Sequence, residues 1–137
     1  YTPQMIVNGE KDVVGNRPLD LAEMLISAKF TAPKASVDIA RVDDILTVSA
    51  QALGAGVGPA DIHVIRYLPE QMQKIAKGEN AGLSQRYTHI VTDWTTPATW
   101  DGTDRFDAEF DITGPGPVVV LVQTERFGAI LAAARIK

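Results

Sequence analysis

Two histidines, with a few hydroxyl and carboxylate residues, are the side chains in this sequence that could do acid–base or metal chemistry. His63 and His89 are the only histidines, and each lies in an alternating apolar stretch. A metal site would need a third ligand, and no spaced carboxylate motif supplies one. Ser84, His89 and Asp93 could be assembled into a Ser-His-Asp triad, but no Gly-x-Ser-x-Gly elbow activates the serine. The sequence therefore predicts no catalytic residue, no metal site and no cofactor.

Aromatic side chains offer a second kind of site. Trp94, Trp100 and Tyr67 could form a flat platform that stacks on a sugar ring or a peptide. The alternative is that they pack in the core or along an edge, which is the more common role of two tryptophans in a small β-rich chain. The sequence leaves both interpretations open.

The stretch Gly78-Glu79-Asn80-Ala81-Gly82 offers a third kind of candidate site. Its two glycines allow close backbone approach, so Glu79 and Asn80 could bind a cation or a polar ligand. The favoured interpretation is a turn in which Asn and Gly adopt left-handed conformations. In that case Glu79→Ala changes the free energy of unfolding by less than about 0.5 kcal/mol.

Composition limits the classes of function. The chain has 137 residues, 45% hydrophobic and 22% charged, which is enough for one packed core. Thirteen Lys and Arg are scattered among seventeen Asp and Glu, giving a net charge of -4, so a nucleic-acid backbone is not an expected partner. No apolar run reaches the roughly 20 residues of a membrane helix. Without cysteine, the chain offers no thiol nucleophile and no thiolate ligand.

The elements before residue 30 are predicted from turn and cap signals. Asn8-Gly9 separates two short apolar runs and favours a tight turn, which predicts an antiparallel hairpin over residues 5–14. Asn16 then serves as a helix N-cap, and the apolar spacing predicts a helix over residues 17–28. Residues 31–34, Thr-Ala-Pro-Lys, read as a linker.

After residue 35 the apolar pattern has a period of two. Turn signals at regular spacing separate short strands, which predicts a mostly antiparallel β-sandwich without a helix longer than about three turns. Pro69 is expected to stop one of these strands. The expected strands include residues 62–67, 87–94, 106–112, 118–123 and 130–136.

Several short stretches resemble one known family. "YTPQMIVNG" followed by "VVG" and a helix, then "GENAG", "WDG" and the ending "GAILAAARI", resemble the domain of unknown function 1223 family of secreted or periplasmic bacterial proteins. The resemblance implies an α+β fold in two parts. Residues 1–30 would be the second half of a thioredoxin-like domain, a β-hairpin plus a helix, and residues 35–137 a sandwich-like domain. A Cys-x-x-Cys segment would precede them.

The resemblance also implies roles for the first residues. Thr2 and Pro3 would form the substrate-facing loop with a cis proline, and the chain would be a fragment whose partner is the upstream thioredoxin-like half of the same precursor. Without that half, an open sheet edge would favour self-association. The implied location is secreted or periplasmic, although residues 1–29 lack the pattern of a signal peptide.

Two functions follow as hypotheses. The first is a fragment of a thioredoxin-like protein linked to thiol–disulfide chemistry. The chain alone is not expected to catalyse exchange, because the attacking group is a thiolate. The alternative is a non-enzymatic β-sandwich module that binds a peptide, a sugar or an envelope protein.

Overall fold

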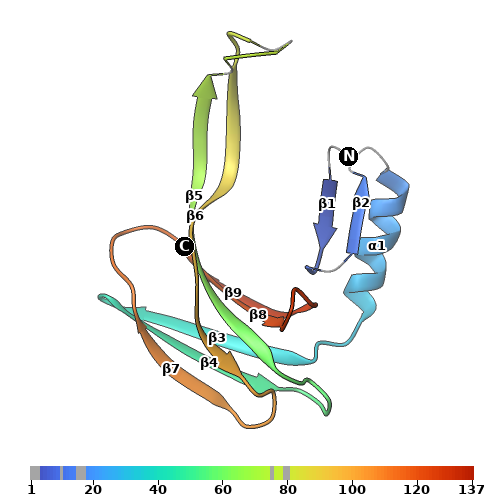
Figure 1. The fold of residues 1–137 in the computed structure, drawn as a ribbon, viewed down its shortest axis with the longest axis vertical. Helices are drawn as coiled ribbons and strands as arrows, with labels where there is room; N and C mark the ends of the chain where they lie inside the picture. Colours follow the sequence, from blue (N-terminus) through green and yellow to red (C-terminus); the bar gives the residue numbers. More distant parts are fainter. Residues whose placement is uncertain (1–3, 10, 15–17, 75, 79–80) are drawn as a thin grey trace.

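The structure is a computed structural model that describes residues 4–9, 11–14, 18–74, 76–78 and 81–137. Within these residues the chain forms one helix and nine strands (Figure 1). The elements in chain order are β1 (Gln4–Val7), β2 (Lys11–Val14), α1 (Pro18–Phe30), β3 (Ala35–Val42), β4 (Ile45–Ala52), β5 (Ala60–Lys74), β6 (Ser84–Trp100), β7 (Phe106–Asp111), β8 (Val118–Thr124) and β9 (Ile130–Ile136).

The first two strands form the predicted hairpin. β1 pairs antiparallel with β2, from Gln4 opposite Val14 to Val7 opposite Lys11. The turn residues Asn8 and Gly9 have φ angles of 52° and 80°. Positive φ at both central positions is what a two-residue hairpin turn requires, so the turn chemistry read from the sequence is confirmed.

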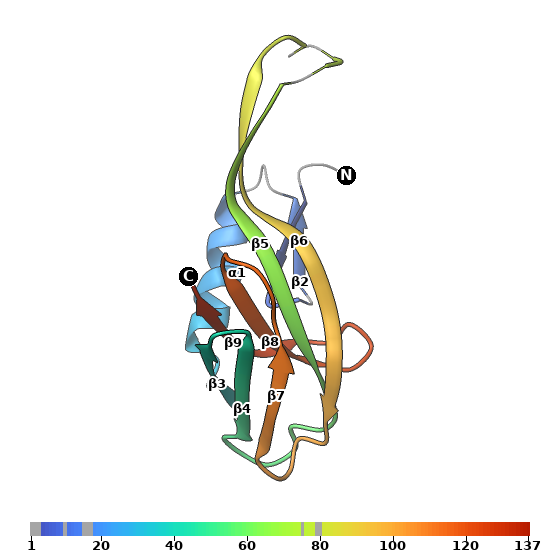
Figure 2. The same cartoon turned by 90° about the vertical axis from the view of Figure 1, so that its left-hand side faces the viewer.

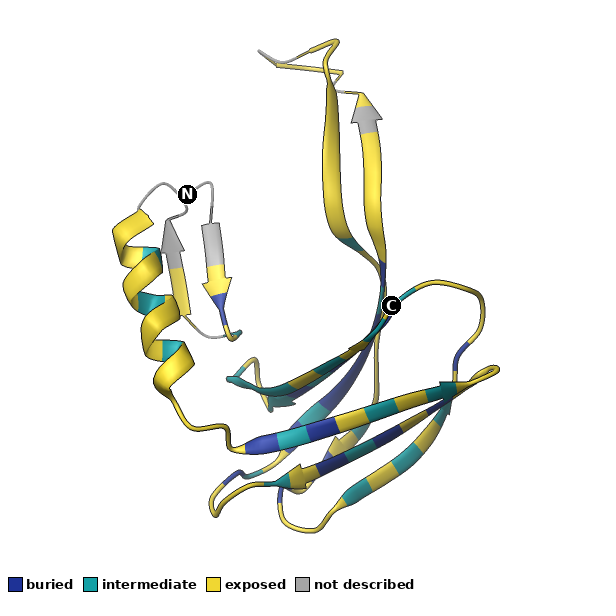
Figure 3. Ribbon diagram, turned by 180° about the vertical axis from the view of Figure 1, so that it is seen from behind, coloured by how far each residue is buried: buried dark blue, intermediate teal, exposed yellow. Residues whose placement is uncertain are grey.

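The rest of the chain forms two antiparallel sheets that pack face to face. One has the order β3-β4-β7 and the other β6-β5-β8-β9. Alternate residues of each sheet point into a shared core, and Figure 3 shows this alternation along the strands of the body. The largest fully buried side chains are Leu46, Val48, Ile62, Val118, Val120 and Val122.

A two-stranded arm projects from the four-stranded sheet. β8 pairs with β5 from Ala60 to Arg66 and no further. β5 and β6 continue as a ribbon beyond that point, up to Lys74 opposite Ser84. Figures 1 and 2 show this ribbon rising away from the body, and Figure 3 shows that its residues are mostly exposed. Both long edges of the arm therefore face away from any other described strand.

The hairpin and α1 join the body beside the turn between β8 and β9 (Figure 1). The backbone N–H of Ile130 donates to the carbonyl oxygen of Asn8 at 2.8 Å. No described side chain of α1 is fully buried; Leu21, Met24 and Ala28 are half-buried, and Phe30 is exposed. Packing therefore holds the helix through one side only.

The expected fold class is wrong. An α+β chain with a partial thioredoxin-like unit would need a sheet that the helix covers as part of a larger layer. Instead, β1 and β2 form a separate two-stranded sheet, and α1 is the one helix among the described residues. The described chain is mostly antiparallel sheet, in three sheets. The hairpin and helix were predicted locally, but two four-residue strands do not create a thioredoxin-like layer.

Two strand limits also differ from the prediction. β5 runs through Pro69 and β6 spans Ser84–Trp100, so both are much longer than expected. Proline was read as a stop because it cannot donate to a ladder. Pro69 lies beyond Arg66, where β5 has lost β8 as a partner, so the outer edge of β5 tolerates a residue without an N–H.

Candidate functional site

Aromatic side chains follow one face of β5 and β6 from the sheet into the arm. Ile65 pairs with Trp94, Tyr67 with Val91, and Gln71 with Tyr87. Paired residues of antiparallel strands point to the same face, and residues two apart on β5 share that face as well. Trp94, Tyr67 and Tyr87 therefore lie along one surface, opposite the face that carries the core residue Val64. We call the row formed by His63, Trp94, Tyr67, His89 and Tyr87 the aromatic stripe. Within it His63 and Tyr67 are buried, whereas Trp94 and Tyr87 are exposed.

Trp94 and His63 form the first ring contact of the aromatic stripe. Their ring centroids are 5.0 Å apart with an interplanar angle of 56°, and the indole Nε1–H donates to His63 Nδ1 at 3.3 Å. His63 is 8% exposed whereas Trp94 is 50% exposed. The buried imidazole thus holds a large, half-exposed indole in a fixed orientation.

His63 is itself held from three sides. Its Nδ1 lies 2.8 Å from the hydroxyl of Thr96, and its Nε2 lies 3.0 Å from Oε1 of Gln123. The amide nitrogen of Gln123 donates to the carbonyl of Gly128 at 2.9 Å, so Oε1 must accept from the imidazole. These partners assign the neutral tautomer with its proton on Nε2. Both ring nitrogens are engaged, so His63 is placed to orient Trp94.

Tyr67 and His89 form the second ring contact of the aromatic stripe. Their centroids are 5.4 Å apart. His89 has a φ of 53°, in the left-handed region that few residues other than glycine adopt. It lies opposite Pro69, between the pairs Leu68 with Ile90 and Glu70 with Thr88. The arm therefore keeps one locally strained residue where its partner strand has no N–H to offer.

The edge of β6 next to the aromatic stripe is free in the described part of the chain. β6 has 17 residues and pairs with β5 on one side; no other described strand pairs with it. From Tyr87 to Thr96 its sequence contains a single charged residue, Asp93. Natural edge strands are commonly blunted by charges, prolines or bulges. In β6 the proline and the nearest register shift both lie near the end that carries Trp100, at Pro97.

Arg66 stiffens the base of the arm. Its guanidinium donates to the carbonyl oxygens of all five residues from Thr113 to Pro117, at distances between 2.7 and 3.4 Å. Arg66 is also the last residue of β5 that pairs with β8. The loop before β8 is thereby tied to the point where the arm leaves the sheet, and Arg41 adds a bond to the Gly114 carbonyl at 2.7 Å.

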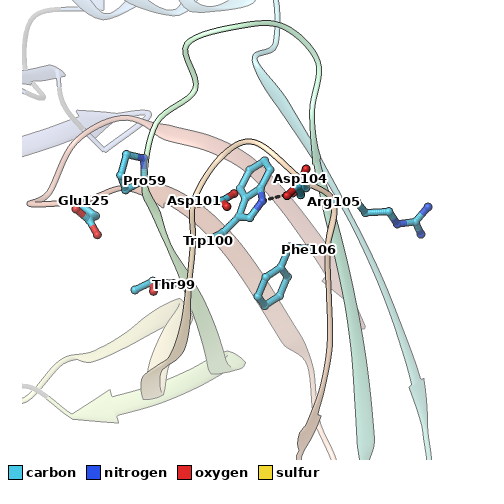
Figure 4. Close-up of a pocket in the computed structure, with 8 residues that line it drawn as sticks. All are labelled: Pro59, Thr99, Trp100, Asp101, Asp104, Arg105, Phe106 and Glu125. Atoms are coloured by element: carbon cyan, nitrogen blue, oxygen red, sulfur yellow. Dashed lines mark hydrogen bonds between the residues drawn. The ribbon is translucent and has the colours of Figure 1, made fainter.

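A shallow pocket of about 510 Å³ lies at the other end of β6 (Figure 4). Its wall is Trp100, which is 4% exposed and donates from Nε1 to the Asp104 carbonyl at 2.6 Å. Figure 4 shows Arg105 directed away from the other lining side chains, and its Nε donates to Ser49 and Asp107. The remaining lining residues are Pro59, Thr99, Asp101, Asp104, Phe106 and Glu125.

The electrostatics of this pocket are acidic. Asp101 Oδ1 accepts from the backbone N–H of Thr103 at 2.8 Å. This bond, together with the hydroxyl of Thr103, lowers the pKa of Asp101 below its ordinary value of 3.8. The carboxylate caps a turn, which accounts for its position. Among the described residues no group of three His, Asp or Glu side chains is arranged to hold a metal ion.

Four of the candidate site residues predicted from the sequence are not described by the structure. Thr2, Pro3, Glu79 and Asn80 lie outside the described residues. Of the neighbouring described residues, Gly78 and Gly82 have φ angles of 92° and 86°. The N–H of Ala81 donates to the carbonyl of Gly78 at 3.1 Å.

The structure does not bring together the two groups of residues considered from the sequence, the Ser-His-Asp triad and the three-residue aromatic platform. Ser84, His89 and Asp93 lie on the single strand β6, and five residues of extended chain span roughly 16 Å, so Ser84 and His89 are far apart. Trp94 and Tyr67 share the aromatic stripe, whereas Trp100 is buried at the opposite end of the strand. Sequence reasoning missed Gln123 and Thr96, since no local pattern indicates that they meet His63.

Comparison with known proteins identifies a family and a similar solved structure. The sequence profile of the family described as Protein of unknown function (DUF1223) matches residues 1–123. A crystal structure of a protein from Agrobacterium tumefaciens, a structural genomics target, is similar with a TM-score of 0.76 and 25% sequence identity over 99% of this chain. The chain spans 61% of the length of that protein.

The remaining comparisons give no further information on the fold or the family. A crystal structure of a β-glucosidase from Kluyveromyces marxianus in complex with glucose covers 79% of this chain and 14% of that enzyme. Its TM-score is 0.33 and its identity 12%, too low to support an argument. No match was found among curated proteins. No helix in the described part of the chain has both the length and the apolar character needed to cross a membrane.

Proposed function

The chain belongs to the DUF1223 family, and from its geometry we propose that it is a non-enzymatic module that binds an extended polypeptide along the free edge of β6. The observation that carries this proposal is one juxtaposition. The long edge strand β6 carries a single charged residue between Tyr87 and Thr96. On the same strand, the half-exposed indole of Trp94 is hydrogen-bonded to the buried His63.

The free edge supplies the affinity in this proposal. An unpaired strand presents a row of backbone N–H and C=O groups that an incoming extended chain satisfies by adding a strand to the sheet. An isolated two-stranded ribbon is marginal in water, so a third strand would also stabilise the arm. A sugar would stack on the aromatic rings but would leave this row of backbone groups unpaired, so a polypeptide fits both features better.

The aromatic stripe supplies the specificity. Val91 and Trp94 are 51% and 50% exposed, and they lie on either side of a register shift at the base of the arm. Interface residues that dominate binding are commonly Trp or Tyr held rigidly in advance, because little side-chain entropy is then lost on binding. We expect Trp94 to be the main anchor for an apolar side chain of the ligand.

The family resemblance adds a location to the proposal, secreted or periplasmic, which cell fractionation would test. A link to thiol–disulfide chemistry would depend entirely on cysteines outside this chain, because the chain contains none. An envelope polypeptide is accordingly the class of ligand that we propose.

Calorimetric titration with synthetic peptides tests the proposal. The probe is a ten-residue peptide of alternating Val and Thr with two lysines at each end, and its control has proline at every second position. The proline peptide cannot donate the ladder of N–H bonds, so we expect it to bind at least about tenfold more weakly. Trp94→Ala should weaken binding of the first peptide by roughly five- to thirtyfold, the range of an interface anchor.

Val42→Ala is the control, because Val42 is 71% exposed and lies at the end of β3, in the other sheet. Its binding should equal that of the parent. Equal binding of the two peptides would exclude strand addition. Binding of cellohexaose that depends on Trp94, without binding of either peptide, would replace the proposal with a carbohydrate site.

A further inference from the structure

A second pocket lies where the hairpin and helix meet the body. It has a volume of about 400 Å³, within the range of small-molecule sites. Figure 1 shows the β1–β2 turn beside the turn between β8 and β9. The lining comes from the hairpin, the end of α1, the linker before β3 and the start of β9: Val7, Asn8, Lys11, Ala28, residues 31–34 and residues 129–133.

The walls of this pocket are fixed by close packing. Val7 is buried, and the Ile130 N–H donates to the Asn8 carbonyl at 2.8 Å. A Cβ placed on Gly9 would lie 2.9 Å from Cγ1 of Ile130, so hairpin and β9 already touch at one end. The opposite side is lined by small side chains, including Ala28 of α1 and the exposed Ala133 of β9. The pocket therefore lies between the hairpin and β9, which are in contact at one end.

The charge of the pocket is opposite to that of the whole chain. Lys11 and Lys34 line it from two different elements, and neither forms an ion pair within the part of the chain that the structure describes. No described lining residue carries a carboxylate, although the chain as a whole has a net charge of -4. A local excess of positive charge in an acidic protein attracts anions.

The helix end at the pocket does not cancel this charge. The last carbonyls of a helix carry partial negative charge. Here the backbone N–H of Thr31 donates to the Ala28 carbonyl at 3.3 Å, and its hydroxyl donates to the Ser27 carbonyl at 3.0 Å. Two of the final carbonyls are thus already paired, which leaves the lysine side chains as the charged groups that face a ligand.

We propose that this pocket binds a small organic anion with a short apolar body, such as a medium-chain carboxylate. The anionic group lies between Lys11 and Lys34, and the apolar body lies against the alanines of α1 and β9. This site is independent of the polypeptide site on β6, and either can fail without the other.

Methyl NMR of alanine-labelled protein tests this site directly, because alanines line it. The probe is octanoate, and the charge-reversed control is octylammonium. Octanoate should shift the methyl signals of Ala28 and Ala133, and octylammonium should leave them in place. Replacing both lysines, Lys11→Gln with Lys34→Gln, should weaken octanoate binding roughly two- to thirtyfold, since each exposed charge contact contributes roughly 0.2–1 kcal/mol.

Two further variants separate binding from folding. Ala133→Leu fills the pocket from an exposed position and should abolish the shifts while the remaining spectrum stays unchanged. Lys74→Gln with Lys77→Gln removes the same charge from the arm and should bind octanoate like the parent. The proposal is overturned if octylammonium binds equally well or if the Lys11 and Lys34 variant binds unchanged. It is also overturned if no methyl shifts at about 10 mM octanoate, where even a 1 mM site would be mostly filled.

Discussion

The Nε1–H of Trp94 donates to the Nδ1 of His63 at 3.3 Å, and the two rings lie 5.0 Å apart. A buried polar residue thereby fixes an exposed aromatic one at the base of the arm. His63 receives its own orientation from Gln123, which lies 60 residues away in the sequence. The proposed binding surface therefore depends on a hydrogen-bonded chain that starts inside the sheet.

His63→Ala is expected to destabilise the fold and release Trp94. The change removes the partner of Gln123 and Thr96 in a buried position, which costs roughly 1–3 kcal/mol. Denaturant unfolding measures the loss of stability, and near-ultraviolet circular dichroism measures the ordering of the indole. His89→Ala is the control for the loss of an imidazole and should leave the Trp94 signal intact. A Trp94 signal that survives in His63→Ala would show that the imidazole does not hold the indole.

Arg66→Lys is expected to lower the free energy of unfolding by roughly 1–3 kcal/mol. Lysine keeps the positive charge but cannot present the planar fork that serves the carbonyls from Thr113 to Pro117. Arg86→Lys is the matched control, since Arg86 forms an exposed ion pair with Glu70 at 3.0 Å whose loss should cost less than about 1 kcal/mol. Equal effects in chemical denaturation would mean that the carbonyl cluster contributes nothing beyond charge.

Gly102→Ala is expected to destabilise the protein by more than about 2 kcal/mol. Gly102 has a φ of 81°, and a Cβ there would collide with the carbonyl oxygen of Gly58. Gly82→Ala has nearly the same φ, 86°, but open space around the new methyl group. The difference between the two melting temperatures isolates the collision from the backbone strain. If both variants melt together, the close approach of the two loops is absent.

Asp101→Asn is expected to remove part of the acid sensitivity of the fold. The pKa of Asp101 is lowered in the folded state by the bonds from Thr103, so its contribution to stability is present above its ordinary, unfolded pKa of 3.8. That contribution disappears as the pH falls through the lower, folded pKa. Melting temperatures recorded between about pH 7 and pH 2 should converge for parent and variant at the acid end. A constant difference across this range would contradict the assignment.

The sequence predicted what local chemistry decides. Asn8-Gly9 specifies its own turn geometry, and the period-two pattern after residue 35 specifies strands, so both agree with the structure. Pro69 was misread because the effect of a proline depends on whether a neighbouring strand needs its N–H, which the strand itself does not reveal. The thioredoxin-like interpretation failed for a related reason. A hairpin and a helix are compatible with many folds, and the sheets around them decide the class.

The proposed sites were even less accessible from the sequence. Trp94 and Trp100 lie six residues apart on one strand, yet one is half-exposed on the aromatic stripe and the other is buried at the end of β6. The register shifts between β5 and β6 change which face each residue takes, and no residue type announces them. Lys11 and Lys34 come together only because the hairpin folds back onto β9.

Backbone hydrogen exchange of β6 tests the central claim most directly. The measurement compares amide exchange rates with and without the Val-Thr peptide, using the proline-containing peptide as the control. Strand addition predicts slower exchange for the outward amides of β6 between Tyr87 and Thr96, with no change in β9, the other edge strand of the sheet. Unchanged exchange along β6 under conditions where the peptide binds, or protection confined to β9, would contradict the proposed function.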